Sequence, residues 1–511
     1  MKRDGACKSA WQHSMPDYEP AVTQIPSNKI FDVLVAGGGI TGLTTALLLQ
    51  KAGKQCILAE AHNIGFGTTG GTTAHINTLL DHPYNEIKSK FGEKNAQLLS
   101  QATRQAVQLI KSNIKEYNIE CSFSELPGYL YSQNEKQSKE LENILEASRE
   151  AGIGISYVDQ IPVPIPFEKA VMFSGQAKFH PIEYIYSIAK AFEEAGGILL
   201  QNCRVQNIEE KDVIYTETSI GIIKTKQLIY ATHIPPGVNL IHFRCAPYRS
   251  YAMAIQLKDD NYPNGLAYDM YDPYHYYRTQ NIKGKNYLIA GGEDHKTAHE
   301  ENTENCFRKL EAYIRKYFAV EEISFRWSSQ YFEPADGLPY IGHLPGHDEN
   351  IFVATGFGGN GITCGTISSF VLRDMIVTGT SEYEKLFDPN RIKPMAGFKK
   401  FVKENVDVVG QFVGKWFAVS DMENLAELSP GEAKLVKYEG EKIALYKDGK
   451  GAIHAVNPTC PHVKCAVSWN TAEKSWDCPC HGSRFSADGE LWTGPSRSDL
   501  EKIELKDLVH E

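Results

Sequence analysis

The chain has 511 residues, a net charge of −10 and the apolar and charged fractions of an ordinary globular protein, which suggests about two to four domains. The acidic balance excludes a typical nucleic-acid binder, because such a protein needs a concentrated basic surface. The polar N-terminus lacks the apolar core of a secretory signal, and most of the eleven cysteines are scattered singly, so a reducing, cytoplasmic location is expected.

The predicted elements begin after a polar N-terminal arm, residues 1–30, which we expect to be flexible. A short apolar strand over 30–35 runs into a glycine-rich turn and a helix, and a second strand ends at Glu60. The glycines permit a tight turn and the close approach of a pyrophosphate to the helix N-terminus, while the carboxylate is placed to bind a ribose hydroxyl pair. This strand–turn–helix unit accounts for the long uncharged run over 33–50, so a membrane-spanning helix is not needed to explain it. The unit could bind either FAD or NAD. Its expected cofactor-binding residues are Gly37, Gly39, Ile40, Thr41, Gly42 and Glu60.

A loop of small residues follows the acid directly, from Gly65 to His75 (Gly-Phe-Gly-Thr-Thr-Gly-Gly-Thr-Thr-Ala-His). It resembles the flavin-contacting loop of the D-amino-acid oxidase-like (DAO) superfamily of FAD-dependent oxidoreductases, and short matching segments extend the resemblance over residues 31–390. The resemblance implies FAD as the cofactor, with contacts at Thr69, Gly71, Thr72, Thr73 and Val205. His75 lies where some dimethylglycine-type relatives attach FAD covalently; the alternative is a hydrogen-bonding loop histidine.

The resemblance also implies a fold, which is an α/β Rossmann-type FAD domain interleaved with an antiparallel-sheet substrate domain (α+β). The FAD domain is expected from residues 31–85, 155–235 and 325–390, and the substrate domain from residues 86–154 and 236–324. Residues 248–257 and 274–278 alternate in the way expected for strands of the antiparallel sheet.

A second glycine motif, Gly356-x-Gly358-x-x-Gly361, follows an apolar strand over 351–355. Taken alone it suggests an NADH site and a pyridine-nucleotide reductase. The helix after it ends near Gly379, however, and no second strand ending in an acid follows. We therefore interpret the motif as backbone amides that face the flavin pyrimidine edge and stabilise negative charge there. The implied cofactor contacts are Gly358, Gly359, Asn360, Gly361 and Ile362.

The richest polar and aromatic stretch of the substrate domain lies at residues 275–278 and in the turn 291–295, although ordinary cross-strand pairs would also explain it. In amino-acid-oxidising relatives an arginine a few residues after a tryptophan holds the substrate carboxylate. The matching stretch here, Trp327-Ser-Ser-Gln330-Tyr331, has no arginine, which puts an α-amino acid in doubt and leaves Arg278 as the candidate substitute. The candidate catalytic residues are Tyr276, Arg278 and His75.

The C-terminal region contains two cysteine–histidine half-motifs, Cys460-x-His462 and Cys478-x-x-His481. Two thiolates and two imidazoles are the ligands of a Rieske-type [2Fe–2S] cluster, and they would also hold structural zinc. One Cys and one His in each half-motif favour the cluster. Each ligand loop carries a further cysteine, Cys465 or Cys480, placed to bridge the two loops as a disulfide.

These loops resemble those of Rieske domains of the cytochrome bc type, including a Gly494-Pro495 loop that covers the cluster. Ser483 is placed to hydrogen-bond a cluster sulfur and raise its potential. Phe485 stands where high-potential relatives have Tyr, so we expect a potential below the top of the Rieske range. The Rieske domain is assigned to residues 416–511. Residues 391–415 are predicted to form a linker helix, with a membrane-surface helix as the alternative.

The two modules together predict a flow of electrons. We expect an FAD-dependent dehydrogenase that oxidises a small amine or amine-like substrate and passes electrons singly to the Rieske cluster and an unknown one-electron acceptor. The alternative is an electron-transfer or redox-sensing protein without its own substrate. A Rieske oxygenase would need a mononuclear iron site of two histidines and a carboxylate, for which the chain has no domain. No nucleic-acid partner and no peripheral membrane contact are expected.

Overall fold

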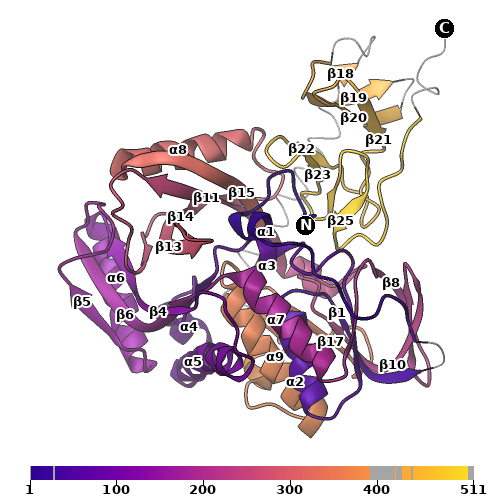
Figure 1. Cartoon of the computed structure of the whole chain (residues 1–511), viewed down its shortest axis with the longest axis horizontal. Coiled ribbons are helices and arrows are strands. Elements are labelled where there is room, and N and C mark those ends of the chain that lie inside the picture. Colours follow the sequence, from indigo (N-terminus) through magenta and orange to yellow (C-terminus); the bar gives the residue numbers. More distant parts are fainter. Residues whose placement is uncertain (1, 27–28, 392–419, 422–427, 439–440, 505–511) are drawn as a thin grey trace.

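The computed structural model describes residues 2–26, 29–391, 420–421, 428–438 and 441–504. Two large sheets with their helices make up residues 30–391, and two small sheets make up the C-terminal part (Figure 1). Among the described helices, none combines the length and the apolar character needed to cross a bilayer. Apart from Arg391, the predicted linker helix lies outside the described residues.

The first large sheet is a Rossmann-type sheet, in which β7, β2, β1, β10 and β17 run parallel. Its strands are β1 (Ile30–Ala36), β2 (Cys56–Ala59), β7 (Ile198–Leu200), β8 (Val205–Glu210), β9 (Ile214–Thr218), β10 (Gly221–Tyr230), β16 (Tyr340–His343) and β17 (Ile351–Thr355). Helices α2 (Ile40–Lys51), α7 (Pro181–Glu194) and α9 (Gly361–Thr378) pack beside it. Strands β1, β2, β7 and β17 are almost wholly apolar because a parallel sheet is covered on both faces. The predicted strand, turn and helix of residues 30–49 are confirmed.

The second large sheet carries the substrate domain and is mostly antiparallel, in the order β15-β11-β14-β13-β12-β4-β6-β3, with β5 beside β6. Its strands are β3 (His75–Ile76), β4 (Ser124–Ser132), β5 (Ile155–Val158), β6 (Lys169–Lys178), β11 (Cys245–Leu257), β12 (Leu266–Tyr268), β13 (Tyr276–Ile282), β14 (Lys285–Lys296) and β15 (Val320–Pro334). The domain also contains α4 (Tyr84–Phe91), α5 (Glu93–Glu116), α6 (Glu135–Glu150) and α8 (Glu304–Tyr317). The predicted strand 248–257 lies within β11, and the predicted strand 274–278 overlaps the start of β13, which begins at Tyr276.

The structure moves two domain boundaries from their expected positions. Strands β5 and β6 fall in the predicted FAD segment 155–235, yet they belong to the substrate sheet, where β6 pairs with β4. The same holds for β15, which pairs along its length with β11. These strands belong to the substrate domain because their hydrogen-bonded partners lie in its sheet. A long antiparallel strand extends the sheet of its partner even where the chain passes from one domain to the other. A boundary drawn from motifs alone does not contain this information.

The N-terminal segment is packed against the flavin loop, where a flexible arm was expected. Helix α1 (Ala10–Ser14) buries Trp11 completely, and the Trp11 Nε1 donates to the Thr72 carbonyl at 2.7 Å. The Gln12 Nε2 donates to the Gly65 carbonyl at 2.7 Å. These polar groups satisfy backbone carbonyls of the loop, so a segment that is polar in sequence is buried in the structure.

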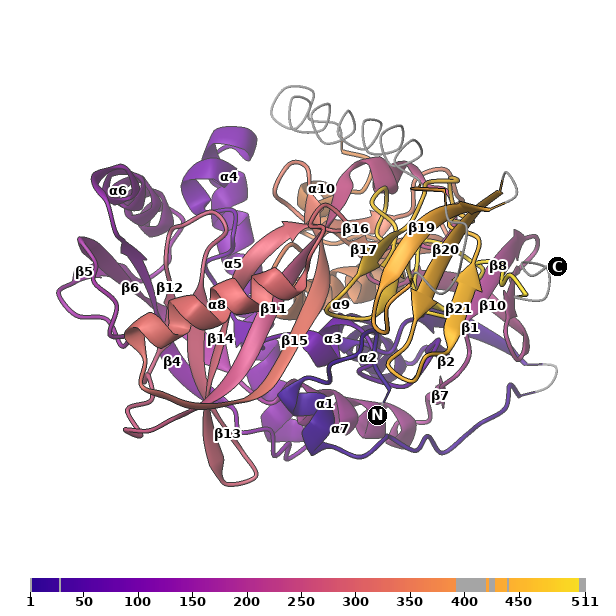
Figure 2. The ribbon, with the colours of Figure 1, turned by 90° about the horizontal axis from the view of Figure 1, so that it is seen from above.

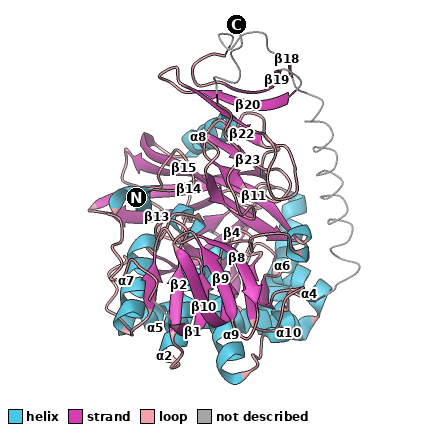
Figure 3. Ribbon diagram, turned by 90° about the vertical axis from the view of Figure 1, so that its right-hand side faces the viewer, coloured by secondary structure: helices cyan, strands magenta, loops and turns pink. Residues whose placement is uncertain are grey.

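The Rieske domain consists of two four-stranded sheets, β18-β19-β20-β21 and β22-β23-β24-β25. Their bounds are β18 (Ser420–Asp421), β19 (Ala433–Tyr438), β20 (Glu441–Lys447), β21 (Ile453–Val456), β22 (Ser468–Asn470), β23 (Ser475–Asp477), β24 (Arg484–Phe485) and β25 (Leu491–Thr493). The second sheet sits against the two larger domains, and the first lies farther out (Figures 1 and 3). Figure 2 shows the same domain from above, in front of the FAD sheet.

Candidate functional site

The turn after β1 forms the base of a long cavity. Gly37 has a φ of +113°, and a Cβ there would lie 2.4 Å from the Ala231 carbonyl oxygen. A Cβ on Gly42 would lie 1.9 Å from the Gly37 carbonyl oxygen. Only glycine fits these two positions, and the tight turn directs the N-terminus of α2 into the cavity. Gly42 therefore shapes the turn and is the one predicted contact residue that does not line the cavity.

Glu60 follows the C-terminal end of β2 and lines the same cavity. Its Oε2 accepts from the Gly38 backbone at 2.6 Å and its Oε1 from the His62 backbone at 2.9 Å. Burial raises the pKa of Glu60, while these backbone donors act in the opposite direction. The carboxylate is thus held in place with acceptor capacity left for ribose hydroxyls.

The predicted cofactor residues come together around this cavity from five separate segments of the chain. The lining includes Gly37, Gly39, Ile40, Thr41, Glu60, Thr69, Gly71, Thr72, Thr73, Val205, Gly358, Gly359, Asn360, Gly361 and Ile362. Gly358 has a φ of +55°, and α9 begins at Gly361 after the Asn360 cap. The chain continues from α9 into α10 (Glu384–Phe387) and not into another strand of this sheet. This arrangement supports the flavin interpretation of the second glycine motif over an NADH site.

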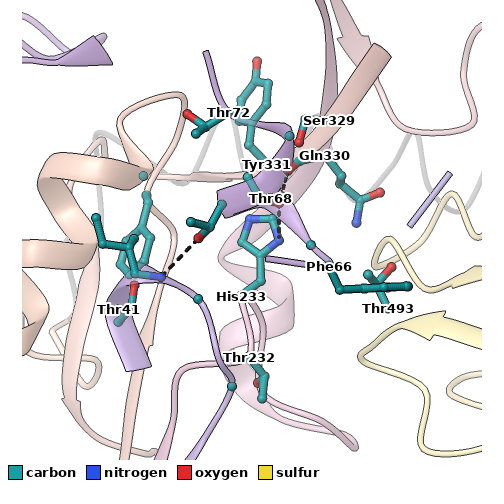
Figure 4. A pocket seen from close by; sticks show the side chains of 18 of the residues that line it. Thr41, Phe66, Thr68, Thr72, Thr232, His233, Ser329, Gln330, Tyr331 and Thr493 are labelled. Carbon is teal, nitrogen blue, oxygen red and sulfur yellow. Dashed lines mark hydrogen bonds between the residues drawn. The ribbon is translucent and has the colours of Figure 1, made fainter. Parts of the chain in front are cut away.

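Several cavity residues were not predicted as site residues. Figure 4 shows His233 beneath Thr68, with the His233 Nδ1 and Thr68 Oγ1 3.3 Å apart, and Gln330 and Thr493 at the far wall. Burial lowers the pKa of His233 to about 4, so its ring is neutral near pH 7. Asp294 also lines the cavity. The sequence predicted residues 291–295 as a turn, but they belong to β14, which carries Asp294 along the cavity wall.

Two of the three candidate catalytic residues reach the cavity. Tyr276 lies against Gly291, where a Cβ would come within 2.2 Å of the tyrosine ring, and its hydroxyl is 2.9 Å from the Ser250 Oγ. The His75 ring lies edge-on to the Tyr268 and Tyr276 rings, and its buried Nε2 has no hydrogen-bond partner among the described residues. Burial, with Arg278 nearby, lowers the pKa of His75 well below its usual value, so the ring is neutral.

Arg278 does not line the cavity, so the expectation that it holds a substrate carboxylate is not supported. It is fully buried behind His75, and its guanidinium stacks on Trp11 at 5.1 Å from the ring centre. It donates to the Gln280 Oε1 at 2.9 Å and to the Phe179 carbonyl at 3.2 Å. Tyr276 and Arg278 do share a strand face, but two residues span roughly 7 Å of strand, which carries the arginine past the cavity.

The four predicted cluster ligands lie in two facing loops of the Rieske domain. One loop connects β21 to β22 and the other connects β23 to β24. The His462 and His481 rings are 5.0 Å apart, and the Nδ1 atom of each is buried without a hydrogen-bond partner. Cys460 and Cys478 are also buried, side by side. Two thiols and two unpartnered imidazole nitrogens are the donor set of a Rieske cluster, so these residues fit the group.

The surroundings of the ligands agree with the sequence interpretation. Cys465 and Cys480 form a disulfide between the loops, with Cα atoms 6.5 Å apart and exposures of 5% and 4%. This shielding is what a disulfide beside the cluster needs in a reducing compartment. The Ser483 hydroxyl contacts the Cys460 thiol and accepts from the Ser496 backbone at 2.9 Å.

The cluster loops contact the wall of the flavin cavity directly. Gln330, which lines the cavity, donates from its Nε2 to the Gly482 carbonyl at 2.8 Å, and Gly482 follows the ligand His481. The other ligand histidine, His462, has its Nε2 3.0 Å from the Gly237 carbonyl oxygen of the FAD domain.

A second contact closes the nucleotide end of the cavity. The Arg204 Nη2 donates to the Leu491 carbonyl at 2.6 Å and to the His62 Nε2 at 2.9 Å. Residues 492–494 and Ser496 of the Rieske domain line the cavity beside them. The two cofactor sites therefore share one wall.

Comparison with known proteins agrees with both halves of this description. The family model for FAD-dependent oxidoreductases of the DAO type matches residues 32–375, and the Rieske [2Fe–2S] domain model matches residues 415–504. The chain belongs to the DAO family of FAD-dependent oxidoreductases and carries a C-terminal Rieske domain. FAD and a Rieske cluster are its cofactors.

Individual relatives show how far the similarity extends. The putative Rieske 2Fe-2S iron-sulfur protein YhfW of Bacillus subtilis (strain 168) is 32% identical over 95% of this chain and 96% of its own length. Gamma-glutamylputrescine oxidoreductase of Escherichia coli (strain K12) is 23% identical over 68% of this chain and 83% of its own. Glycine oxidase from Geobacillus kaustophilus superposes with a TM-score of 0.59 at 16% identity, covering 71% of this chain and 99% of that structure, so it supports the fold alone.

Proposed function

We propose that this oxidoreductase oxidises a small amine at the carbon beside nitrogen and sends the electrons singly through the Rieske cluster to an external one-electron acceptor. The amine leaves as an imine, two protons pass to solvent, and two acceptor molecules each take one electron. Bound FAD accepts the two electrons together, and the cluster carries them one at a time.

The observation that carries the proposal is the shared wall between the two cofactor sites. Gln330 lines the flavin cavity and bonds the cluster loop at Gly482, while Gly237 of the FAD domain contacts the ligand His462. A cluster that served only an outside donor would not need its ligand loops against the flavin cavity. The contact supports electron passage within the chain.

The substrate side of the cavity supports an enzyme over a plain electron-transfer module. The cavity continues beyond the cofactor-binding loops to Ser250, Tyr268, Tyr274 and Asp294 of the substrate domain. A protein without its own substrate would not need this extension. His75 in the same wall is neutral, so its unpartnered Nε2 is available as a hydrogen-bond partner for a bound amine.

The test is anaerobic mixing of the fully loaded protein with primary, secondary and N-methyl amines. We expect loss of flavin absorbance with at least one amine class, and the EPR signal of the reduced cluster in the same sample. Cys478→Ser is the control: it should still be bleached by that amine but give no cluster signal. A bleached flavin beside an oxidised cluster contradicts the electron path, and bleaching by NADH alone contradicts the amine substrate.

A further inference from the structure

The substrate sheet places a carboxylate with an unpartnered oxygen in the cavity wall. This residue is Asp294, near the end of β14. We infer that Asp294 binds the ammonium group of the substrate, which is a cationic amine without an α-carboxylate. The inference rests on the proposed function, because it assigns the charge of the substrate in that same site.

The geometry of Asp294 leaves one of its oxygens for a ligand. The Oδ2 accepts from the Tyr331 hydroxyl at 3.0 Å, while the Oδ1 is buried and has no hydrogen-bond partner among the described residues. An ionised carboxylate in such a place is costly unless a partner supplies charge or donors. Burial accordingly raises the pKa of Asp294 to about 7. A bound ammonium group would supply both the charge and the donor.

Aromatic rings surround this carboxylate. Tyr268, Tyr274, Tyr276 and Tyr331 line the same cavity, and the Tyr274 and Tyr276 rings lie 5.6 Å apart. The faces of aromatic rings attract alkylammonium groups, and the attraction increases when water is excluded. A carboxylate among tyrosines is thus suited to a cation with apolar substituents, and poorly suited to an anion.

Among the described residues, the substrate end of the cavity offers no cationic side chain to a substrate carboxylate. The one arginine or lysine among the described lining residues is Arg204, which is bonded to His62 and Leu491 at the nucleotide end. Arg326, beside the family tryptophan, is paired with Glu304 at 2.9 Å on the outer side of the sheet. An α-amino acid would bring its carboxylate toward Asp294 with no guanidinium to balance it.

A neighbouring cavity provides an acidic approach to this end. It has a volume of about 920 Å³ and shares Asn77, Tyr268 and Tyr274 with the main cavity. Five acidic side chains line it against two lysines: Asp81, Glu86, Glu140, Asp269 and Asp272. Such a surplus of negative charge raises the local concentration of cations.

The test uses binding probes that cannot be turned over. The FAD- and cluster-loaded protein is titrated with choline, with its uncharged isostere 3,3-dimethylbutan-1-ol and with glycine betaine, which adds a carboxylate; perturbation of the flavin absorption spectrum reports binding. We expect choline to bind at least about tenfold more tightly than either comparison compound, as for a desolvated charge–aromatic contact of about 1.4 kcal/mol or more. Equal affinity for the three compounds overturns the inference, as does the absence of saturable binding by both choline and tetramethylammonium.

Matched variants assign the effect to the carboxylate. D294N should weaken choline binding about tenfold and leave 3,3-dimethylbutan-1-ol binding unchanged, and D294E should retain most of the choline affinity. E293Q, on the same strand but outside the cavity lining, should bind as the parent protein does. Flavin content shows that each variant is folded. Unchanged choline binding by D294N overturns the inference while amine bleaching still supports the proposed function. Asp294-dependent choline binding without bleaching by any amine supports the inference and contradicts the proposed function.

Discussion

The charge of a single residue, Asp294, determines which ligands the substrate end of the cavity can bind. Tyr331 donates to its Oδ2, and Tyr274 and Tyr276 face it with pKa values raised by burial. The pKa of the nearby His275 is raised to about 9 by Asp269 and Glu293, although its burial opposes that shift. Asp81 lies close enough to raise the pKa of Asp294 further. Within this set the pKa near neutral pH is that of Asp294, and burial also raises the pKa of Asp81.

Choline binding should depend on pH with a defined sign. Above about pH 7 Asp294 is ionised and holds the cation, and below that value it is protonated and the affinity falls. We expect an affinity loss approaching tenfold per pH unit below the transition in the parent protein and a flat profile in D294N. Spectral titrations between pH 5.5 and pH 8.5, a window of about 1.5 units either side of that value, measure this directly. Weaker binding at high pH would contradict the assignment.

The role of a single residue can be predicted from the sequence where that role depends on a local sequence pattern. The glycines of the first turn, Glu60 and the four cluster ligands all lie where their spacing placed them. Arg278 shows the limit. Its residue type and neighbours suggested an anion site, but only the strand position shows that its guanidinium passes the cavity and stacks on Trp11.

Strand β15 links the two cofactor sites through Gln330. Its Oε1 accepts from the Thr297 hydroxyl at 3.2 Å, which fixes the amide so that the Nε2 points to the Gly482 carbonyl. Replacing the amide with leucine removes this hydrogen bond and leaves a buried carbonyl unsatisfied, at a cost of about 1–3 kcal/mol to the docked arrangement.

Q330L should therefore slow reduction of the cluster and not of the flavin. We expect the amine-dependent bleaching rate to stay within about twofold, while the appearance of the cluster EPR signal slows by about fivefold or more, as a cost of about 1 kcal/mol implies. Rapid-freeze EPR beside stopped-flow absorbance separates the two steps. Gln256→Leu, on the outer part of β11 where the amide donates to Glu322 and Ser324, is the control. Equal slowing of both steps would indicate general damage.

Helix α1 is an element that supports the flavin loop from outside. Trp11 is fully buried between His180 and Trp327 and bonds the Thr72 carbonyl. Trp11→Ala should destabilise the FAD domain by about 3–5 kcal/mol through the cavity that it leaves, and it should loosen the loop that contacts the cofactor. Thermal release of FAD, followed by its fluorescence, should occur at a lower temperature. Trp492→Phe at the Rieske edge of the cavity tests whether loss of any nearby indole has that effect.

The sequence did not predict α1 as a packed element, for a physical reason. The helix is only five residues long, too short to show an apolar period, and its stability comes from tertiary contacts. The strands of the Rossmann unit, in contrast, are apolar runs bounded by glycines and could be predicted from local pattern.

On the scale of the whole molecule, a buried ionic network joins three parts of the chain. Arg484 of the Rieske domain pairs with Asp477 and with Asp4 of the N-terminal segment, each at 3.0 Å. Arg3 pairs with Asp4 at 3.0 Å, and Glu473 accepts from the Ser328 backbone of the substrate sheet at 2.8 Å. Removal of one partner from such a buried network leaves an uncompensated charge, which costs about 3–5 kcal/mol.

Asp4→Ala should weaken the attachment of the Rieske domain. Although burial opposes it, the pKa of Asp4 is lowered by Arg3 and Arg484, so its contribution is present above the usual value of 3.8 and is lost as the pH falls through the lower folded value. At neutral pH we expect faster proteolysis near the Rieske domain and slower cluster reduction in this variant. Asp17→Ala, in the same segment but outside the network, is the control. Unaltered cleavage would show that the network does not hold the domain.

The arrangement of the domains could not be predicted from motifs. Each cofactor site is local enough to leave a pattern, but the contacts between them join residues as far apart as Asp4 and Arg484, or Gly237 and His462. Asp4, Arg484 and Gly237 belong to no recognisable motif, and the motif that contains His462 does not specify its partner across the interface. Their role depends only on the surfaces that folding brings together.

The histidine edge of the cluster site is covered by the FAD domain. His481 is 7% exposed, His242 lies 4.9 Å from the His462 ring and 5.6 Å from the His481 ring, and His462 bonds Gly237. The surface through which an electron would enter in the proposed function is therefore also covered against large oxidants in solution. In this arrangement an electron would reach the cluster on one face and leave it from another. An acceptor must therefore bind specifically at a different face of the Rieske domain. Such a protein would lose few electrons to nonspecific oxidants, and its turnover rate would depend on the concentration of one particular acceptor.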